Sequence, residues 1–290
     1  MKIITLTLSP AIDIEYQVAA VKTDSTSRAT SHKVTAGGKG VNVSRALIGC
    51  GIAKADLVTV APLGGSTGEM MASILAGEGI DVTGVKIKEN TRVNISVIGK
   101  DSHSVEVNAP GTPVGDSLAD IENLILDSLD ESDVLVIAGS CPSDVKKSYP
   151  AELCKKAKNK GATVVLDCDG EALVNAVNSD CPPDLIKPNK EELGGLIGRE
   201  LVTDADVTAA AESLDSRISV ITTMAGDGAY FTFGGKSEFF PSEKRDVVRL
   251  KGAGDTFLGA FVYARFYLGK SVADSMAYAA KVAGDYVAGL

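Results

Sequence analysis

The segment best suited to chemistry is Gly252-Ala253-Gly254-Asp255, in which an acid follows a glycine turn. It comes after a β-branched, strand-like run at 247–250 and before an apolar helical pattern that starts at Thr256. Backbone N–H groups of such a turn can converge on an anion at the helix N-terminus, where the helix dipole favours negative charge. A carboxylate beside this anion hole can take a proton from an attacking hydroxyl while the amides stabilise a phosphoryl group in transfer. On this segment alone, an ordinary N-cap at Asp255 remains an open alternative.

A second glycine turn, Gly37-Gly38-Lys39-Gly40, also leads into a helical pattern. It is not a Walker A motif, because Lys39 is followed by Gly40 instead of Ser or Thr, and no GxGxxG fingerprint follows the first strand. The turn lets the backbone approach a polar ligand closely, with Asn42 in the first helical turn. A tight turn before an amphipathic helix is the alternative.

Two further segments have both a structural and a chemical interpretation. Asn189 and Glu192 are spaced as a capping box, but they could also hold Mg²⁺ through water while Lys187 faces phosphate. Residues 222–228, with Thr223, Gly226 and Gly228, form either a hairpin turn or a contact to a nucleotide phosphate. Spacing does not choose between these interpretations.

The overall charge argues against broad binding to nucleic acid or to anionic membranes, because the formal net charge is −9. A local basic pocket for a phosphorylated metabolite is compatible with it. No run of the 290 residues is long and apolar enough to span a bilayer, and the N-terminal run is typical of a first strand. We therefore expect a cytoplasmic protein.

Cysteine and histidine usage limits the metal and disulfide chemistry. The cysteines are Cys50, Cys141, Cys154, Cys168 and Cys181, an odd number without CxxC spacing. This pattern disfavours a disulfide framework or a zinc site and favours buried thiols in a reducing compartment. With two histidines in the chain, we expect no His-rich metal site.

The elements that must position these residues alternate between strands and helices. Short β-branched runs lie at 3–8, 57–61, 134–138, 163–166, 185–187 and 218–222, and helical periodicity at 41–50, 67–78, 117–129, 143–160, 171–177, 191–196 and 205–214. This alternation predicts an α/β fold with a mostly parallel sheet covered on both faces. The site is then expected at the carboxyl ends of the strands.

Two stretches break the alternation, at 12–18 with 32–35 and at 92–99 with 104–108. Residues 93–98 alternate apolar and polar side chains, which is typical of a half-exposed antiparallel strand. We predict a small projecting sheet that acts as a lid. The Ala/Gly-rich run at 271–284 predicts close-packed helices.

In their order along the chain, these segments resemble the ribokinase-like, PfkB-type carbohydrate kinases, in the branch that contains 1-phosphofructokinase and tagatose-6-phosphate kinase. The resemblance rests on residues 7–13, 37–45, 91–94, 139–142, 187–192 and 252–255. It implies one kinase domain over 1–290, a three-layer α/β/α sandwich with a β-lid from about 12–36 and 91–109, and pairing of lids in a homodimer.

The resemblance also implies a role for each matching residue. Asp13, Gly37, Gly38, Lys39, Asn42 and Ser140 would bind the sugar, and Arg28 and Arg92 would hold its phosphate. Lys187, Asn189, Thr223, Gly226 and Gly228 would line ATP, and Asn189 and Glu192 would hold Mg²⁺ indirectly. Asp255 would be the base, and Gly252, Ala253 and Gly254 the anion hole.

Three positions depart from the family pattern. Ser9 stands where this branch often has Asn, and Ala225 replaces the usual first glycine of the nucleotide turn. Lys251 replaces a small or apolar residue before the anion hole, where it either adds positive charge near a phosphate or points to solvent.

The leading expectation is ATP-dependent phosphorylation of fructose 1-phosphate to fructose 1,6-bisphosphate, with tagatose 6-phosphate as the alternative acceptor. A non-catalytic sugar-phosphate-binding protein is the alternative from another class. An intact Asp255 argues against it, because a pure binder does not need a base there. A dinucleotide-dependent oxidoreductase would fit the strand–helix alternation but not the absent fingerprint.

Overall fold

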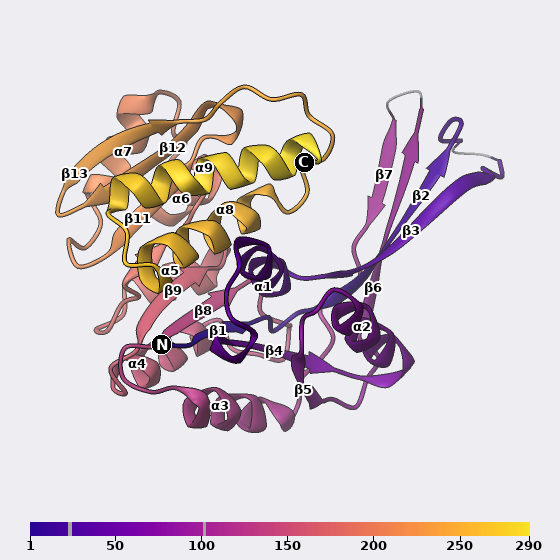
Figure 1. Cartoon of the computed structure of the whole chain (residues 1–290), viewed down its shortest axis with the longest axis horizontal. Helices are drawn as coiled ribbons and strands as arrows, with labels where there is room; N and C mark the ends of the chain where they lie inside the picture. The colour runs from indigo at the N-terminus through magenta and orange to yellow at the C-terminus, as the bar shows by residue number, and fades with distance from the viewer. Residues whose placement is uncertain (23–24, 101–102) are drawn as a thin grey trace.

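The computed structural model describes residues 1–22, 25–100 and 103–290, so residues 23–24 and 101–102 of the predicted lid lie outside the described residues. Its main sheet has the order β13-β12-β11-β10-β9-β8-β1-β4-β5 (Figure 1). The strands of this sheet are β1 Ile3–Leu6, β4 Leu57–Leu63, β5 Val82–Lys86, β8 Val134–Ala138, β9 Thr163–Asp167, β10 Leu185–Ile186, β11 Ser219–Thr223, β12 Gly228–Phe233 and β13 Lys236–Pro241.

The central strands pair in parallel, and both of their faces are buried under helices (Figure 1). β8 consists only of buried residues, and β1 pairs in parallel with β8 on one side and β4 on the other. Strands buried on both faces read as continuous apolar runs, which is why the sequence revealed them. β12 and β13 instead form an antiparallel pair at the sheet edge, beside β11.

Helices cover both faces of this sheet (Figure 1). They are α1 Lys39–Cys50, α2 Gly65–Gly77, α3 Ser117–Ser128, α4 Tyr149–Lys158, α5 Gly170–Val177, α6 Lys190–Ile197, α7 Asp204–Glu212, α8 Ala253–Val262 and α9 Val272–Ala288. Helices α3 to α7 share one buried apolar cluster, and α1, α8 and α9 share another. Neighbouring β1 residues enter different clusters, Ile3 that of α1, α8 and α9 and Ile4 that of α3 to α7, as side chains alternate along a strand.

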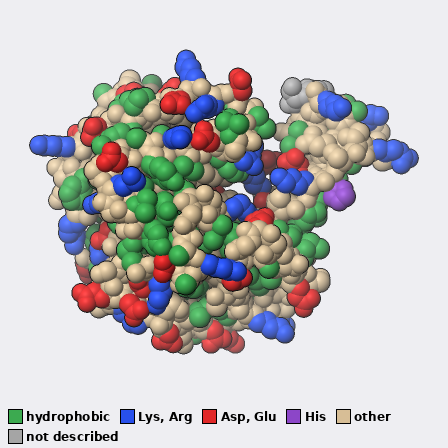
Figure 2. Space-filling view, in the orientation of Figure 1, with side chains coloured by type: hydrophobic (Ala, Val, Ile, Leu, Met, Phe, Trp, Pro, Cys, Tyr) green, Lys and Arg blue, Asp and Glu red, His purple; other side chains and the backbone are tan. Residues whose placement is uncertain are grey.

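The lid is a four-stranded sheet of order β3-β2-β6-β7, made of β2 Ala11–Val18, β3 Ala29–Gly37, β6 Arg92–Gly99 and β7 Ser104–Val107. Figure 2 shows it as a lobe that projects from the main body. The predicted antiparallel strand at 93–98 is only half right, because β6 is antiparallel to β7 but parallel to β2. The predicted three-layer arrangement with a small projecting sheet is confirmed.

Two predicted elements are wrong in their extent. The helix predicted at 143–160 begins only at Tyr149, with Pro150 in its first turn, where the missing N–H of proline is tolerated. The strand predicted at 247–250 is a loop. Its residues Val248 and Arg249 donate their N–H groups to the carbonyl of Val287 near the end of α9, at 2.9 and 3.1 Å, instead of joining the sheet.

In the part of the chain that the structure describes, no helix combines the length and apolarity needed to cross a bilayer.

Candidate active site

Asp255 lies in the first turn of α8 and is 9% exposed. The side-chain amide of Asn42, on α1, donates a hydrogen bond of 2.7 Å from Nδ2 to Asp255 Oδ2. Burial raises the pKa of Asp255, and the nearby carboxylate of Asp167 raises it further, while the bond from Asn42 lowers it. The result is a carboxyl group with a pKa above its ordinary value, which is typical of a general base.

The turn before Asp255 depends on a glycine at the N-cap of α8. Gly252 is the N-cap of α8 with a φ of 88°, in the left-handed region, and a Cβ there would lie 2.8 Å from the hydroxyl of Tyr286. Because Gly252 has no side chain, it cannot cap the first-turn N–H groups. Lys187 Nζ would lie 3.6 Å from a Cβ on Gly254, so a cation borders the turn.

Asp167, the last residue of β9, links two of the predicted site residues. Its fully buried side chain pairs through Oδ1 with Lys39 Nζ and through Oδ2 with Lys187 Nζ, both at 3.1 Å. Burial raises the pKa of Asp167, but the two lysines outweigh it and hold this pKa below its ordinary value. Glu192 Oε1 lies 3.7 Å from Lys39 Nζ, which brings a further carboxylate to this cluster.

Sequence reasoning missed Asp167. The strand was predicted to end one residue before it, at 166, and the acid lies at the carboxyl end of a buried parallel strand. An acid at that position is the signal that could have identified it, since ligand sites of such sheets lie at these ends.

The base of the lid holds a second group of polar side chains. Asn94 Nδ2 donates to Asp13 Oδ1 at 2.9 Å, and Lys251 Nζ lies 3.0 Å from Asp13 Oδ2. Gly37 allows this arrangement, because a Cβ there would lie 2.3 Å from Asp13 Oδ2. Lys251, although largely exposed, therefore joins the turn before α8 to the lid strand β2. Neither Lys251 nor Asn94 was predicted to contact Asp13.

The remaining predicted sugar-site residues differ in their positions. Arg92, in β6, donates to the carbonyl oxygens of Ala109 and Ser9 at 2.9 and 3.0 Å, close enough to Asp13 to feel its charge. Ser140 is exposed just after β8 ends, at the same edge of the sheet. Arg28 is exposed at the distal end of the lid, about 17 Å along β2 from Asp13 at 3.3 Å per residue. Within a single chain, Arg28 therefore lies far from the polar side chains around Asp13.

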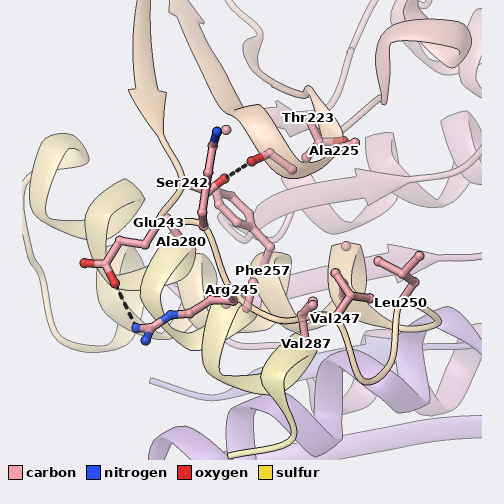
Figure 3. Close-up of a pocket in the computed structure, with 17 residues that line it drawn as sticks. Thr223, Ala225, Ser242, Glu243, Arg245, Val247, Leu250, Phe257, Ala280 and Val287 are labelled. Carbon is pink, nitrogen blue, oxygen red and sulfur yellow. Dashed lines mark hydrogen bonds and ion pairs between the residues drawn. The ribbon is translucent and has the colours of Figure 1, made fainter.

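A cavity of about 540 Å³ lies next to the turn before α8 (Figure 3). Its wall includes Gly254 and three of the residues predicted to line ATP, Thr223, Gly226 and Gly228, but not Lys187 or Asn189. Apolar side chains contribute much of the rest, among them Val247, Leu250, Phe257, Ala280 and Val287. The cavity thus has mostly apolar walls and borders the backbone of the turn at Gly254, which suits a flat aromatic group joined to an anion.

Residues 225–227 form a short 3₁₀ turn between the antiparallel strands β11 and β12, and Ala225 and Gly226 also line the cavity. Ala225 has a φ of 51°, in the region that favours glycine. Ser242 donates to the carbonyl of Gly226 at 3.0 Å and fixes the turn against the loop at 242–250 (Figure 3).

Asn189 and Glu192 form the capping box at the start of α6. Asn189 Oδ1 accepts from the N–H of Glu192 at 2.8 Å, and Glu192 Oε2 accepts from the N–H of Asn189 at 2.9 Å. Asn189 also pairs with Thr223 in a parallel bridge, next to the cavity wall. Among the described residues, no three acids, cysteines or histidines gather as metal ligands. The donor set therefore fits Mg²⁺ only as an ion that keeps waters and phosphate oxygens.

Comparison of the sequence with known proteins identifies the family of this chain. The profile described as pfkB family carbohydrate kinase matches residues 6–287. The chain is 32% identical to 1-phosphofructokinase of Bacillus subtilis over 265 residues, 90% of this chain and 84% of that protein. It is 30% identical to tagatose-6-phosphate kinase of Staphylococcus epidermidis over 259 residues, 88% of this chain and 82% of that protein.

A solved structure agrees over the whole chain. The phosphofructokinase-2 of Escherichia coli in complex with fructose-6-phosphate superposes with a TM-score of 0.91 at 27% identity, covering 100% of this chain and 94% of that one. These relatives lie on the branch that the sequence motifs predicted. The chain therefore belongs to the pfkB family of carbohydrate kinases.

Proposed function

We propose that this protein transfers a phosphoryl group from MgATP to the free terminal hydroxyl of fructose 1-phosphate, giving fructose 1,6-bisphosphate. The observation that carries the proposal is the position of Asp255, a buried acid in the first turn of α8, next to Ala253 and Gly254 in the cavity wall. ATP would place its base in the cavity and its phosphates at the turn. The acceptor would lie between Asp255 and the lid residues around Asp13.

Asp255 would act as general base. Its raised pKa improves proton acceptance from a hydroxyl. The first-turn N–H groups of α8 and the ammonium group of Lys187 would stabilise the charge on the phosphoryl group in transfer. When bound, Mg²⁺ would neutralise phosphate charge, with Asn189 and Glu192 holding it through water.

The acceptor is proposed to carry a phosphate because two cations lie near Asp13. The Asp13 carboxylate acts electrostatically on Arg92 and forms an ion pair with Lys251. The named activity of the Bacillus subtilis relative favours fructose 1-phosphate. Tagatose 6-phosphate is the alternative, by similarity to the Staphylococcus epidermidis relative.

We also propose that 1–290 is one kinase domain that pairs with a second copy through the lid. The lid face with Ile14 and Val93 packs on the apolar cluster of α2 near the lid base. Ile95 and Val107 are paired across β6 and β7, and they continue this face outward with 39% and 60% of their surface exposed. An apolar sheet face of this kind is suited to a second copy.

A coupled assay that follows ADP release tests the function. The acceptors are fructose 1-phosphate, tagatose 6-phosphate, fructose 6-phosphate and unphosphorylated fructose, each with MgATP. We expect the highest kcat/KM with fructose 1-phosphate and at least about tenfold less with unphosphorylated fructose, a difference of about 1.4 kcal/mol in transition-state binding. A maximum with tagatose 6-phosphate would favour the alternative. Binding of sugar phosphates without any transfer would favour the non-catalytic interpretation.

A further inference from the structure

Arg45 joins the candidate base to the body of the protein through one intermediate side chain. Arg45 and Asn42 lie three residues apart on α1 and therefore share a face of the helix. The guanidinium nitrogen NH1 of Arg45 donates to Asn42 Oδ1 at 2.7 Å. Asn42 Nδ2 in turn donates to Asp255 Oδ2 at 2.7 Å. The three side chains form a directed chain of hydrogen bonds that ends on Asp255.

The direction of this chain follows from the chemistry of arginine. A guanidinium group carries only donors, whereas the side-chain amide of asparagine has an acceptor end and a donor end. The Asn42 end that faces Arg45 must therefore be the oxygen, and the end that faces Asp255 must be the nitrogen. With the amide reversed, two donors would meet at Arg45 and two acceptors would meet at Asp255.

Arg45 is itself held in place from two other elements. Its Nε donates to Glu78 Oε2 at 2.8 Å, at the end of α2, and its NH2 donates to the carbonyl of Ala36 in the lid strand β3 at 3.0 Å. The guanidinium group is thus fixed independently of Asn42, which a positioning residue requires.

We infer that Arg45 is a positioning residue: by fixing the side-chain amide of Asn42, it assigns Oδ2 of Asp255 to the hydrogen bond from Asn42 and leaves Oδ1 to take the proton of the acceptor hydroxyl. This inference rests on the proposed role of Asp255 as base. It also changes the interpretation of Asn42, because both polar ends of its amide are engaged by protein groups, which leaves one N–H and one oxygen lone pair for a sugar hydroxyl.

Other groups around Asp255 do not replace this bond. The carboxylate of Asp167 raises the pKa of Asp255, and the ammonium groups of Lys187 and Lys39 lower it through space. Of the causes that lower this pKa, the bond from Asn42 is the largest. Reversal of the Asn42 amide would remove this bond and place an oxygen against the carboxylate, which would raise the pKa of Asp255 further.

The test replaces Arg45 by Met, which keeps the apolar stem and removes every donor, and by Gln, which can present either end to Asn42. For both variants we expect the acid limb of the pH profile of kcat/KM to move up by about one unit. We also expect kcat at neutral pH to fall about tenfold, with a KM for ATP within twofold of wild type. The conservative Arg45→Lys variant keeps a donor, so its pH profile should be shifted less than those of the Met and Gln variants. Lys54→Met is the matched control, because Lys54 forms an exposed ion pair with Asp81 outside this chain of bonds.

A double-mutant cycle with Asn42→Ala separates positioning from general damage. If Arg45 acts through Asn42, Arg45→Met changes kcat little further in the Asn42→Ala background. Circular dichroism and thermal melting identify variants that fail to fold. If Arg45→Met does not fold, the milder Arg45→Gln variant is used for the test.

A direct readout keeps this inference separate from the proposed function. Carbon-13 NMR of labelled aspartates, with the Asp255 signal assigned by its loss in Asp255→Asn, reports the pKa of Asp255 without turnover. A pKa of Asp255 that is the same in wild type and in a folded Arg45 variant would overturn the inference, even in an active enzyme. Absence of phosphoryl transfer in wild type, with the NMR shift present, would instead contradict the proposed function alone.

Discussion

At the scale of the residue, Asp255 is held where its charged form is disfavoured. A carboxyl group in water would titrate near 3.8, and burial together with the charge of Asp167 raises this pKa in the folded protein. The favourable contribution of such a group to folding is complete below the unfolded pKa and is lost as the pH rises through the folded pKa. Above the folded pKa, the protein thus gives up stability to hold the Asp255 carboxylate in place, a cost that is common in active sites.

The Asp255→Asn variant should consequently be more stable than wild type at pH 8, with the difference in Tm shrinking toward pH 4. Differential scanning fluorimetry across this range measures it. Asp206→Asn is the control of opposite sign, because hydrogen bonds from Thr203 lower the pKa of Asp206 and its contribution is present at pH 8 and lost in acid. A Tm difference for Asp255→Asn that does not depend on pH would contradict the raised pKa.

Ala225 has backbone strain in the turn beside the cavity, with a φ of 51°. An L-residue in this region costs about 1–2 kcal/mol of stability. Glycine removes this strain, but it also increases the conformational entropy of the unfolded chain, which offsets part of the gain. We expect Ala225→Gly to raise Tm by about 2 °C and to leave the KM for ATP nearly unchanged. Ala209→Gly, the same change at an exposed position within α7, should lower Tm. A lower Tm for Ala225→Gly would contradict the strain.

At the scale of the element, the sequence predicted what local pattern determines. The continuous apolar run of β8 and the glycine turns before α1 and α8 identified these elements because burial and backbone conformation depend on neighbouring residues. The run at 247–250 has the same β-branched composition but is held by the end of α9, a contact distant in sequence. Composition alone could not distinguish the two cases.

The candidate site divides in the same way. Residues in glycine-rich or family-matching segments, such as Asn42 and Asp255, were named from the sequence, and the structure brings them within hydrogen-bonding distance. Asp167 and Asn94 were missed because their partners lie on other strands and helices. The contact between Lys251 and Asp13 joins residues 238 positions apart, which no spacing rule reaches.

The ion pair between Lys251 and Asp13 is expected to affect substrate binding more than the stability of the fold. The Lys251 side chain is 64% exposed, so its ion pair with Asp13 adds less than about 1 kcal/mol to folding. Lys251→Met removes a cation next to Asp13 and the proposed sugar phosphate, and we expect the KM for the sugar phosphate to rise about fivefold at low salt and less at high salt. Steady-state kinetics with exposed Lys270→Met as the control measures this. An unchanged KM would place the substrate phosphate away from Lys251.

At the scale of the whole molecule, two apolar clusters fix the main sheet between its helices, while the lid extends beyond both. The outward continuation of the α2-facing side of the lid has no cover in a single chain within the described residues. Figure 2 shows basic and acidic side chains gathered where the lid meets the body. The lid thus combines a polar base at the site with an apolar outer part suited to assembly.

Analytical ultracentrifugation tests this assembly. We expect a particle of twice the chain mass of 29.9 kDa for wild type. A double substitution, Val105→Lys with Val107→Lys, places two charges on the exposed lid face and should give the single-chain mass. Val202→Lys changes a still more exposed valine on the main body and should leave the dimer intact. A wild-type monomer, or dissociation by Val202→Lys, would contradict pairing through the lid.

The central claim is that Asp255 removes the proton of the acceptor hydroxyl. Single-turnover phosphoryl transfer, measured for wild type and Asp255→Asn with saturating MgATP and fructose 1-phosphate, tests it most directly. The account predicts that the variant binds ATP within about threefold of wild type and transfers the phosphoryl group roughly 1,000-fold more slowly. Transfer by Asp255→Asn at the wild-type rate would contradict it.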